Sequence, residues 1–442
     1  MSTTLRDRVL RALERGAPAE AFEALAPRRA ELGTDPELDM LWLRALERTP
    51  SRPTLVEEVR KVLAGAPSPA HVVAACAALN AAAQAFPPDA PPPERGPATL
   101  AAEIAAATLE QLGEGDAEAA AYLWINRANA LRAMGPEHDE AAREAYAEAL
   151  ERHPEKGGWW FDLGVLHKWR GRWQEALDCA LRARARLGDQ RAVLWNAALA
   201  ATALGQGDVA AGLWRDLGIE ARLSEGGMPI VEGVPEVRVR APSVASGHGV
   251  LPEPERSFEV LWVAPTSPCH GVVISPSFRD CPVDWGDVVL WDGAPVSQDP
   301  PVFPLLEILR EGDEHRFRFV ALAKRGDVEK IVERLPEGVQ AFAHPVGVEK
   351  DGDVLAYGKL VAPASVDLKA LRGRFEAALA ELRTMRLAMP ELYEKTGPTK
   401  RAGQEHQAWR GIERVALKRG LVPEARADEE RDDADAEEGG AA

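Results

Sequence analysis

The sequence predicts a multidomain protein in which a stack of α-helices is followed by a domain of strands and helices. A 34-residue rhythm between Ala121 and Leu223 supports the first part. Residues recur one period apart, Trp160, Gly171, Ala176 and Ala183 being followed by Leu194, Gly205, Ala210 and Leu217. This period is typical of helical hairpins that each bury their apolar face on a neighbour. Beyond residue 235, runs rich in Val, Phe, Leu and Ile, bounded by Pro, Gly and Asp, predict strands.

The bulk composition is that of a globular protein, with 46% hydrophobic and 28% charged residues in a chain of 442. No apolar run approaches the roughly 20 residues that span a bilayer. The first residues enter an amphipathic helix with Leu5, Val9 and Leu13 at four-residue spacing, without the basic-then-apolar order of a secretory signal. We therefore expect a cytoplasmic protein with no membrane partner.

The chain is acidic, with a formal net charge of −17. Nine acids and two arginines between Glu424 and Glu438 give −7 of this charge. The remainder is also acidic, which argues against nucleic-acid binding, because that function needs a basic face. Four cysteines are too few for a disulfide framework in a chain of this length.

Residues 1–85 are predicted to be helical, and one interpretation is that they form divergent repeats. The expected helices are Leu5–Arg15, Pro18–Ala26, Pro36–Arg48, Thr54–Leu63 and Pro69–Gln84. Three of them begin with proline, which suits a first helical position, and Pro27 should end the second. The proline-rich residues 86–98 are expected to form a linker, and residues 99–224 the clear repeats.

The second repeat carries a large residue, a Leu-Gly pair, a turn glycine and two alanines at fixed spacing, namely Trp160, Leu163-Gly164, Gly171, Ala176 and Ala183. With its neighbours, over about residues 121–224, it resembles the tetratricopeptide repeat. The first and third repeats depart from that pattern, because Arg127-Ala128 and Ala197-Ala198 replace Leu-Gly. The small residues should let paired helices approach closely, while Trp160 and Trp173 fill the space between pairs.

The resemblance implies an α-solenoid whose concave face binds a peptide or protein. Family positions that face the ligand correspond here to Asn126, Asn129, Arg132, Asp162, Lys168 and Asn196. An asparagine can both donate to and accept from a peptide backbone, and the two cations could attract a carboxylate. The alternative interpretation is that these residues only solvate the exposed side of the helices.

Residues 235–390 are predicted to form an α+β domain of no recognised family. Strands are expected at Phe258–Ala264, Gly271–Ser275, Asp287–Trp291, Arg316–Ala323, Val339–Val348 and Val354–Val361, with a hairpin turn at Lys350–Asp353. Helices are expected at Val302–Glu311, Asp327–Leu335 and Val366–Met389. A basic helix at 398–420 could dock an acidic partner or fold back on the chain's own acids. The acidic tail, 421–442, is expected to be disordered.

The candidate residues for chemistry are Cys269, His270 and Cys281. Four more, His248, Asp280, Asp284 and His344, could complete a metal site, but adjacent Cys and His ligands make awkward geometry. Cys269 with a histidine could also act as a nucleophile and its base. No complete catalytic signature is present, so we predict no catalytic residues, metal or cofactor.

The predicted function is a non-enzymatic adaptor that captures a protein or peptide. Two alternatives stay open. One is an enzyme or accessory subunit with its site around Cys269, His270 and Cys281. The other is a target-neutralising or pathway-specific binding protein. The sequence leaves the oligomeric state open.

Overall fold

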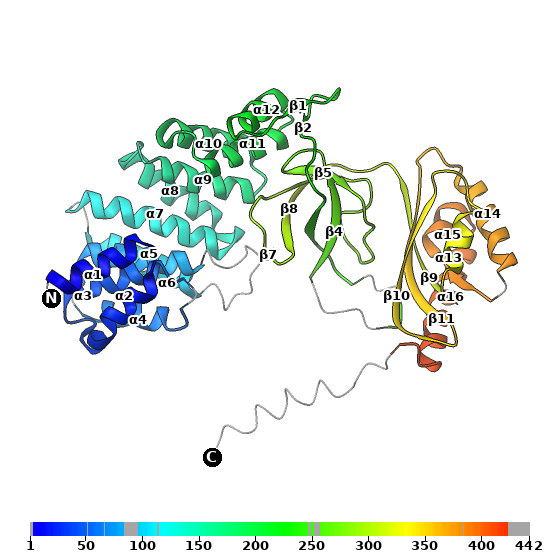
Figure 1. The fold of residues 1–442 in the computed structure, drawn as a ribbon, viewed down its shortest axis with the longest axis horizontal. Coiled ribbons are helices and arrows are strands. Elements are labelled where there is room, and N and C mark those ends of the chain that lie inside the picture. The colour runs from blue at the N-terminus through cyan, green and yellow to red at the C-terminus, as the bar shows by residue number, and fades with distance from the viewer. Residues whose placement is uncertain are drawn as a thin grey trace, which may run out of the picture. The chain divides into compact units, whose positions relative to one another are not determined.

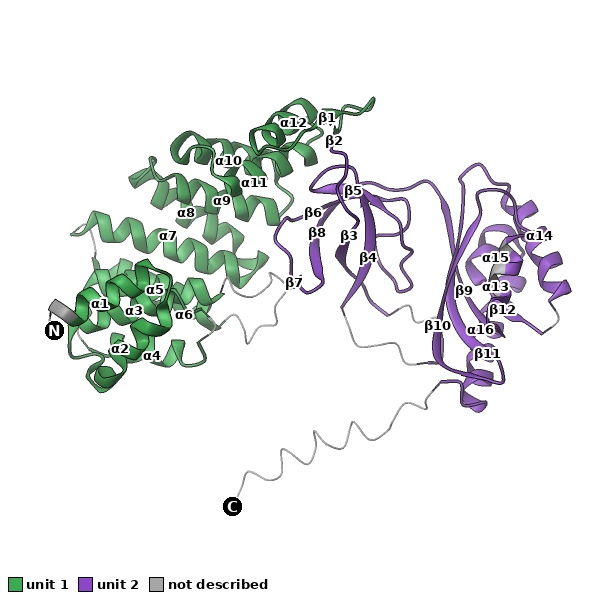
Figure 2. Cartoon of the chain, in the orientation of Figure 1, with its two compact units in different colours: residues 1–229 green, residues 230–442 purple. Residues whose placement is uncertain are grey.

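The computed structural model of the chain describes residues 3–50, 52–65, 67–83, 96–112, 115–245, 249–251, 257–382 and 384–422. The chain divides into two compact units, residues 1–229 and residues 230–442 (Figure 2). In the described residues, helices make up nearly all of the first unit, and strands and helices together make up the second. The predicted order, all-α followed by α+β, is therefore confirmed.

The first part of the helical unit contains the five helices that the sequence predicts. They are α1 (Thr3–Glu14), α2 (Pro18–Leu25), α3 (Pro36–Glu47), α4 (Leu55–Leu63) and α5 (Pro69–Ala83). Proline occupies the first position of α2, α3 and α5, where its missing N–H removes no helical bond. A 3-10 segment (Ala26–Glu31) follows α2, as Pro27 predicts.

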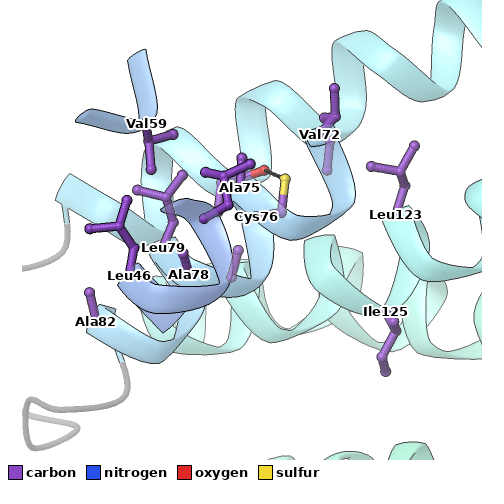
Figure 3. Packing of buried hydrophobic residues seen from close by; sticks show 14 of the residues in the cluster. Leu46, Val59, Val72, Ala75, Cys76, Ala78, Leu79, Ala82, Leu123 and Ile125 are labelled. Carbon is purple, nitrogen blue, oxygen red and sulfur yellow. Dashed lines mark hydrogen bonds between the residues drawn. The ribbon is translucent and has the colours of Figure 1, made fainter. Parts of the chain in front are cut away.

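These helices share one hydrophobic core with the helices that follow, and the core cluster runs from Val9 to Leu166. Figure 3 shows part of it, where side chains of α3, α4, α5 and α7 gather, among them Leu46, Val59 and Leu123. Cys76 is fully buried there, its Sγ lies 3.6 Å from the carbonyl oxygen of Ala101, and burial raises the pKa of its thiol to about 12. It therefore acts as a small buried hydrophobic residue.

Seven further helices follow in the first unit: α6 (Gly96–Leu112), α7 (Ala117–Met134), α8 (Asp139–Arg152), α9 (Gly157–Trp169), α10 (Trp173–Leu187), α11 (Arg191–Ala203) and α12 (Gly207–Asp216). Helix α6 begins three residues before the expected end of the linker, and residues 84–95 lie outside the described residues. Helices α8, α10 and α12 begin at residues 139, 173 and 207, which are 34 residues apart. Helices α7 to α12 lie side by side in chain order (Figure 1).

Close helix packing within the hairpins depends on small residues. A Cβ added at Gly164 of α9 would lie 3.2 Å from the Cβ of Cys179 on α10, which is tighter than ordinary contact. Trp160 of α9 is partly buried against the hydrophobic core, and the guanidinium of Arg182 on α10 lies 4.6 Å from its ring centroid. The glycine therefore sets the distance between the two helices, as its place in the repeat predicts.

The second unit begins with a small barrel. Its strands are β3 (Val237–Pro242), β4 (Phe258–Pro265), β5 (His270–Val273), β6 (Val288–Trp291) and β8 (Pro301–Arg310), with a short β7 (Ser297–Gln298) beside β8; two short strands, β1 (Arg222–Leu223) and β2 (Pro229–Ile230), precede them. Neighbouring strands pair antiparallel from β3 to β8, and β8 then pairs with β3 in parallel. This last pairing closes the ring around Val239, Leu261 and Trp291.

The helix predicted at Val302–Glu311 is wrong, because these residues form strand β8. The run from Val302 to Leu309 is almost wholly apolar, and such a run fits a buried helix turn or a strand equally well. Pairing on both sides, with β6 and β3, decides for the strand. The sequence also missed β3, whose alternating Val-Arg-Val-Arg pattern at 237–240 is typical of a strand with one exposed face.

A four-stranded antiparallel sheet follows, in the order β10 (Gln340–Lys350), β11 (Asp353–Ala362), β9 (His315–Lys324) and β12 (Arg386–Ala388). Side chains of β9 alternate between two cores. Phe317 and Phe319 pack with α13 (Asp327–Val332) and α14 (Leu368–Glu381), whereas Val320 and Leu322 face the opposite side. Strand β9 is therefore buried on both faces of the sheet. The predicted strand–helix–strand–strand–helix order of this region is confirmed.

Two details of this sheet test local predictions. Asp351 and Gly352 both have positive φ, 55° and 76°, as the hairpin turn between β10 and β11 requires. The helix predicted at Val366–Met389 is too long, because α14 ends at Glu381. Residues 386–388 then pair with β9, and Pro390 begins α15 (Pro390–Thr396). A single apolar stretch thus supplies a helix and an edge strand.

The basic helix predicted at 398–420 is α16 (Thr399–Lys418), and it covers one face of the sheet. Its Trp409 and Ile412 are buried against Val320 and Leu355 of the strands. The chain turns at Gly420, which has φ 66°, and Leu421 and Val422 are buried in the same core. The rest of the predicted tail lies outside the described residues.

The barrel and the sheet are joined by buried charges. Lys359 of β11 donates to the carboxylate of Asp284 and to the hydroxyl of Ser277, both in the loop before β6. Arg316 of β9 donates to Asp287 at 2.7 Å. Lys359 and Asp287 are 4% and 1% exposed, so each pair is shielded from solvent. None of the described helices is long and apolar enough to cross a membrane.

Candidate functional site

Helices α9 and α11, the first helices of two successive hairpins, are each followed by a glycine turn. Gly171 and Gly205, 34 residues apart, have φ values of 64° and 67°. The next N–H in each case reaches back to the same helical position, Arg172 to the carbonyl of His167 and Gln206 to that of Ala201. This is a helix stop that requires a left-handed residue. The two stops end α9 and α11 at Trp169 and Ala203, also 34 residues apart, so residues with this spacing occupy equivalent places on the two helices.

Polar side chains link the first helices of successive hairpins. The hydroxyl of Tyr146 on α8 donates to Asn129 Oδ1 on α7 at 2.5 Å, and Asn129 Nδ2 donates to Asp162 Oδ2 on α9 at 3.2 Å. Arg132 donates to the main-chain carbonyl of Asp162 at 2.9 Å. The structure therefore brings together three of the predicted site residues, Asn129, Arg132 and Asp162.

The electrostatics of this group depend on Asp162. Burial raises the pKa of its carboxyl group, and the nearby charge of Arg132 and the hydrogen bond from Asn129 act in the opposite direction. A buried carboxylate is tolerated only with such partners. Because Asn129 already uses both its oxygen and its nitrogen, this group holds α7, α8 and α9 together.

Asn126 makes a similar link one helix earlier. Asn80 Nδ2 on α5 donates to the main-chain oxygen of Asn126 at 2.8 Å and to its Oδ1 at 3.1 Å. Asn126 Nδ2 donates to the carbonyl of Tyr122 at 2.8 Å. Asn126 is 8% exposed, so its amide serves contact between helices. Asn80 and Tyr146 were not predicted as site residues, because neither lies at a position that the repeat resemblance assigns to the ligand.

Lys168 and Asn196 are not part of this group in the contacts described. The ammonium of Lys168 lies 5.4 Å from the ring centroid of Trp169 on the same helix. Asn196 Nδ2 donates to Ala192 one turn earlier at 3.0 Å. Asn196 Oδ1 is buried and makes no hydrogen bond to any residue that the structure describes. The side chain of Asn196 is partly exposed, although this oxygen is shielded from solvent.

Two aromatic residues accompany these polar positions. Phe161 and Trp195 are 34 residues apart, directly precede Asp162 and Asn196, and are partly exposed. The ring of Trp195 meets Trp214 of α12 edge-on at 4.9 Å. Aromatic side chains at equivalent positions of neighbouring helices are suitable anchors for a peptide. Their 34-residue spacing is visible in the sequence, but only polar residues were predicted for the site.

The second unit buries Cys269 and His270. Cys269 is 0% and His270 3% exposed, and Ser267 Oγ lies 2.5 Å from His270 Nδ1. Burial lowers the pKa of His270 to about 4. The imidazole is therefore neutral near pH 7, and His270 is the buried first residue of β5. Cys281 packs against the barrel core, and burial raises the pKa of its thiol to about 11. A low thiolate fraction is unfavourable for nucleophilic chemistry.

The remaining candidates for a metal site are dispersed in the described structure. Asp284 binds Lys359, His344 lies on β10 with its ring 6.1 Å from Phe278, and the main chain of Asp280 pairs with Val244. His248 lies outside the described residues. Within the ranges described, no group of three or more His, Cys, Asp or Glu side chains is placed to hold a metal ion.

A pocket of about 380 Å³ lies in the second unit, beside the loop that carries Trp285. Its lining combines Trp285 with Asp313, Glu314, Gln340 and a Pro-Ala-Ser turn after β11. Glu314 Oε2 is 3.7 Å from Arg316, which also binds Asp287, so the acidic wall is partly neutralised. We assign no ligand to this pocket.

The comparisons with known proteins provide no further guide to the site. No protein-family model matches the chain. The search of the curated proteins also gives no match.

Proposed function

We propose that the chain is a non-enzymatic adaptor, whose tetratricopeptide-like hairpins form an α-solenoid that binds a peptide segment of another protein. The observation that carries the proposal is the equivalence of α9 and α11. Both follow a 34-residue spacing, and both present a partly exposed aromatic residue beside a polar one, Phe161 with Asp162 and Trp195 with Asn196. Aromatic anchors would supply affinity, and the partly exposed side chain of Asn196 would contact the peptide beside them.

The second unit would supply the other contact surface of the adaptor. Trp262 and Val260 on β4 are 45% and 39% exposed on the outer face of the barrel. Arg238, opposite Trp262 in the strand pair, lies 5.5 Å from its ring centroid. Exposed tryptophan and arginine are enriched in protein interfaces. Four free cysteines support the proposal that the protein works in the reducing cytoplasm.

The peptide proposal is tested by selecting a random 12-residue peptide library, displayed on phage, against the full chain. An enriched peptide is then synthesised and titrated against two double variants. Phe161→Ala with Asn196→Ala should weaken binding by about tenfold or more, since truncating an anchor costs over about 1 kcal/mol. The matched control is Leu181→Ala with Val209→Ala, which truncates residues 40% and 41% exposed on α10 and α12.

The control should bind within about twofold of wild type, because these residues lie on the second helices of their hairpins. Thermal unfolding of each variant separates lost binding from lost structure. Equal weakening in both double variants, or no enrichment from the library, would contradict the proposal. Asn126 is unsuitable for this test, because its amide holds α5 against α7.

A further inference from the structure

Helix α16 carries a row of basic residues on its exposed face. Arg410, Arg414 and Lys418 are four residues apart, so they lie on one side of the helix, and all three are exposed. In the part of the chain that the structure describes, none of them forms an ion pair or a side-chain hydrogen bond. We call these three residues the basic row.

The row is not balanced by acids on its own helix. The acid nearest to it in sequence, Glu413, is 1% exposed and points into the sheet core, where it accepts from Tyr357 and Trp409. Like charges four residues apart destabilise a helix. Three such cations in a chain of net charge −17 make this face a suitable surface for an anion.

The chain supplies such an anion next to the helix. Residues 423–442 follow directly, and their nine acids and two arginines carry a net charge of −7. The described chain ends at Val422, which is buried beside the end of α16. The six residues from 423 to 428 reach about 20 Å when extended, which exceeds the roughly 10–12 Å diameter of a helix. The acidic run, Asp428 to Glu438, can therefore return along the row, which spans about 12 Å.

We propose that the basic row of α16 is the docking surface of the chain's own acidic segment, residues 423–442. Tethering gives this segment a high effective concentration at the row. It binds through several exchangeable charge pairs and is weakened by salt. By occupying the row, the segment prevents other polyanions from binding there.

The experiment uses heparin as the polyanion probe and four full-length proteins, titrated at about 0.1 M salt. The first change replaces the nine acids of residues 424–438 by their amides. The second is the triple variant Arg410→Gln, Arg414→Gln, Lys418→Gln. Amide replacement alone should raise heparin affinity by tenfold or more, because the row becomes accessible. In the triple variant the same replacement should raise it less than threefold.

A charge-matched control separates docking from overall charge. Arg44→Gln, Arg60→Gln and Lys61→Gln remove three exposed cations from the first unit. In this background the amide replacement should still raise heparin affinity tenfold. An equal rise in the row variant and the control variant would overturn the proposal, since it would reflect net charge alone. So would an unmodified chain that binds heparin through the row as tightly as the amide variant.

Discussion

Asn129 shows what the structure adds at the scale of single residues. Its position in the repeat predicts a side chain aimed at a ligand, yet its amide bonds Tyr146 and Asp162 on two neighbouring helices. Asn126 likewise holds Asn80. A residue's polarity was readable from the sequence, but its partners come from other helices and depend on how the hairpins stack.

The buried His270 should make the free energy of unfolding depend on pH. Burial lowers its pKa to about 4, against 6.5 for an exposed imidazole. The folded state therefore excludes a proton that the unfolded chain binds below pH 6.5, and the free energy of unfolding should fall as the pH drops through this window. Between pH 7 and pH 5 the loss from this residue is about 2 kcal/mol.

Urea unfolding at both pH values measures this effect, with His270→Asn as the comparison. Asparagine keeps a polar atom near Ser267 but does not titrate, so its stability should fall by about 2 kcal/mol less than that of wild type over the same interval. Parallel losses in the two proteins would show that other groups cause the acid sensitivity.

Among the secondary-structure elements, helices were predicted more reliably than strands. The helix boundaries in residues 3–83 agree with the sequence within a residue or two, because proline starts and apolar periodicity are local signals. The strand β8 was predicted as a helix, and β12 was absorbed into α14. Pairing partners decide both strands, and some of these partners lie more than about 60 residues away along the chain.

We expect the packing of α9 on α10 to depend on the small residue at position 164. Gly164→Leu should lower the free energy of unfolding by about 1–3 kcal/mol, because its side chain must displace Cys179 on the facing helix. Gly212→Ala in α12 is the matched control, since a Cβ there meets nothing within 4 Å. That change should stabilise the protein by about 0.5–1 kcal/mol. Chemical denaturation of both variants tests why position 164 needs a glycine. The expected reason is the close approach of the two helices, and not helix propensity.

In the molecule as a whole, buried charges help to determine how separately folded parts of the chain are joined. Within the second unit, the barrel and the sheet meet through Lys359 and Asp284, which are distant in sequence and largely buried. Removing one partner leaves an uncompensated charge, whereas removing both does not. The pair therefore specifies how these two layers associate.

Asp284→Ala should destabilise the protein by about 3 kcal/mol or more, because the Lys359 ammonium then lacks its partner. The double variant Asp284→Ala with Lys359→Met should recover at least half of that loss. Unfolding followed by near-ultraviolet circular dichroism measures both values. If the double variant is as unstable as the single one, the pair acts through shape and not through charge.

The sequence by itself determined the order of the two fold classes, the 34-residue hairpin period and nearly all the helices, because these follow from local conformational preference and periodicity. The assignment of a ligand site to residues 126–196 also came from the sequence, through the repeat resemblance, and stays a prediction. Only the tertiary structure decided that several of those polar residues bond one another, that 301–310 closes a barrel, and that α16 covers a sheet. Each of these depends on contacts between segments far apart in the chain, and the energy of such contacts is absent from any local pattern.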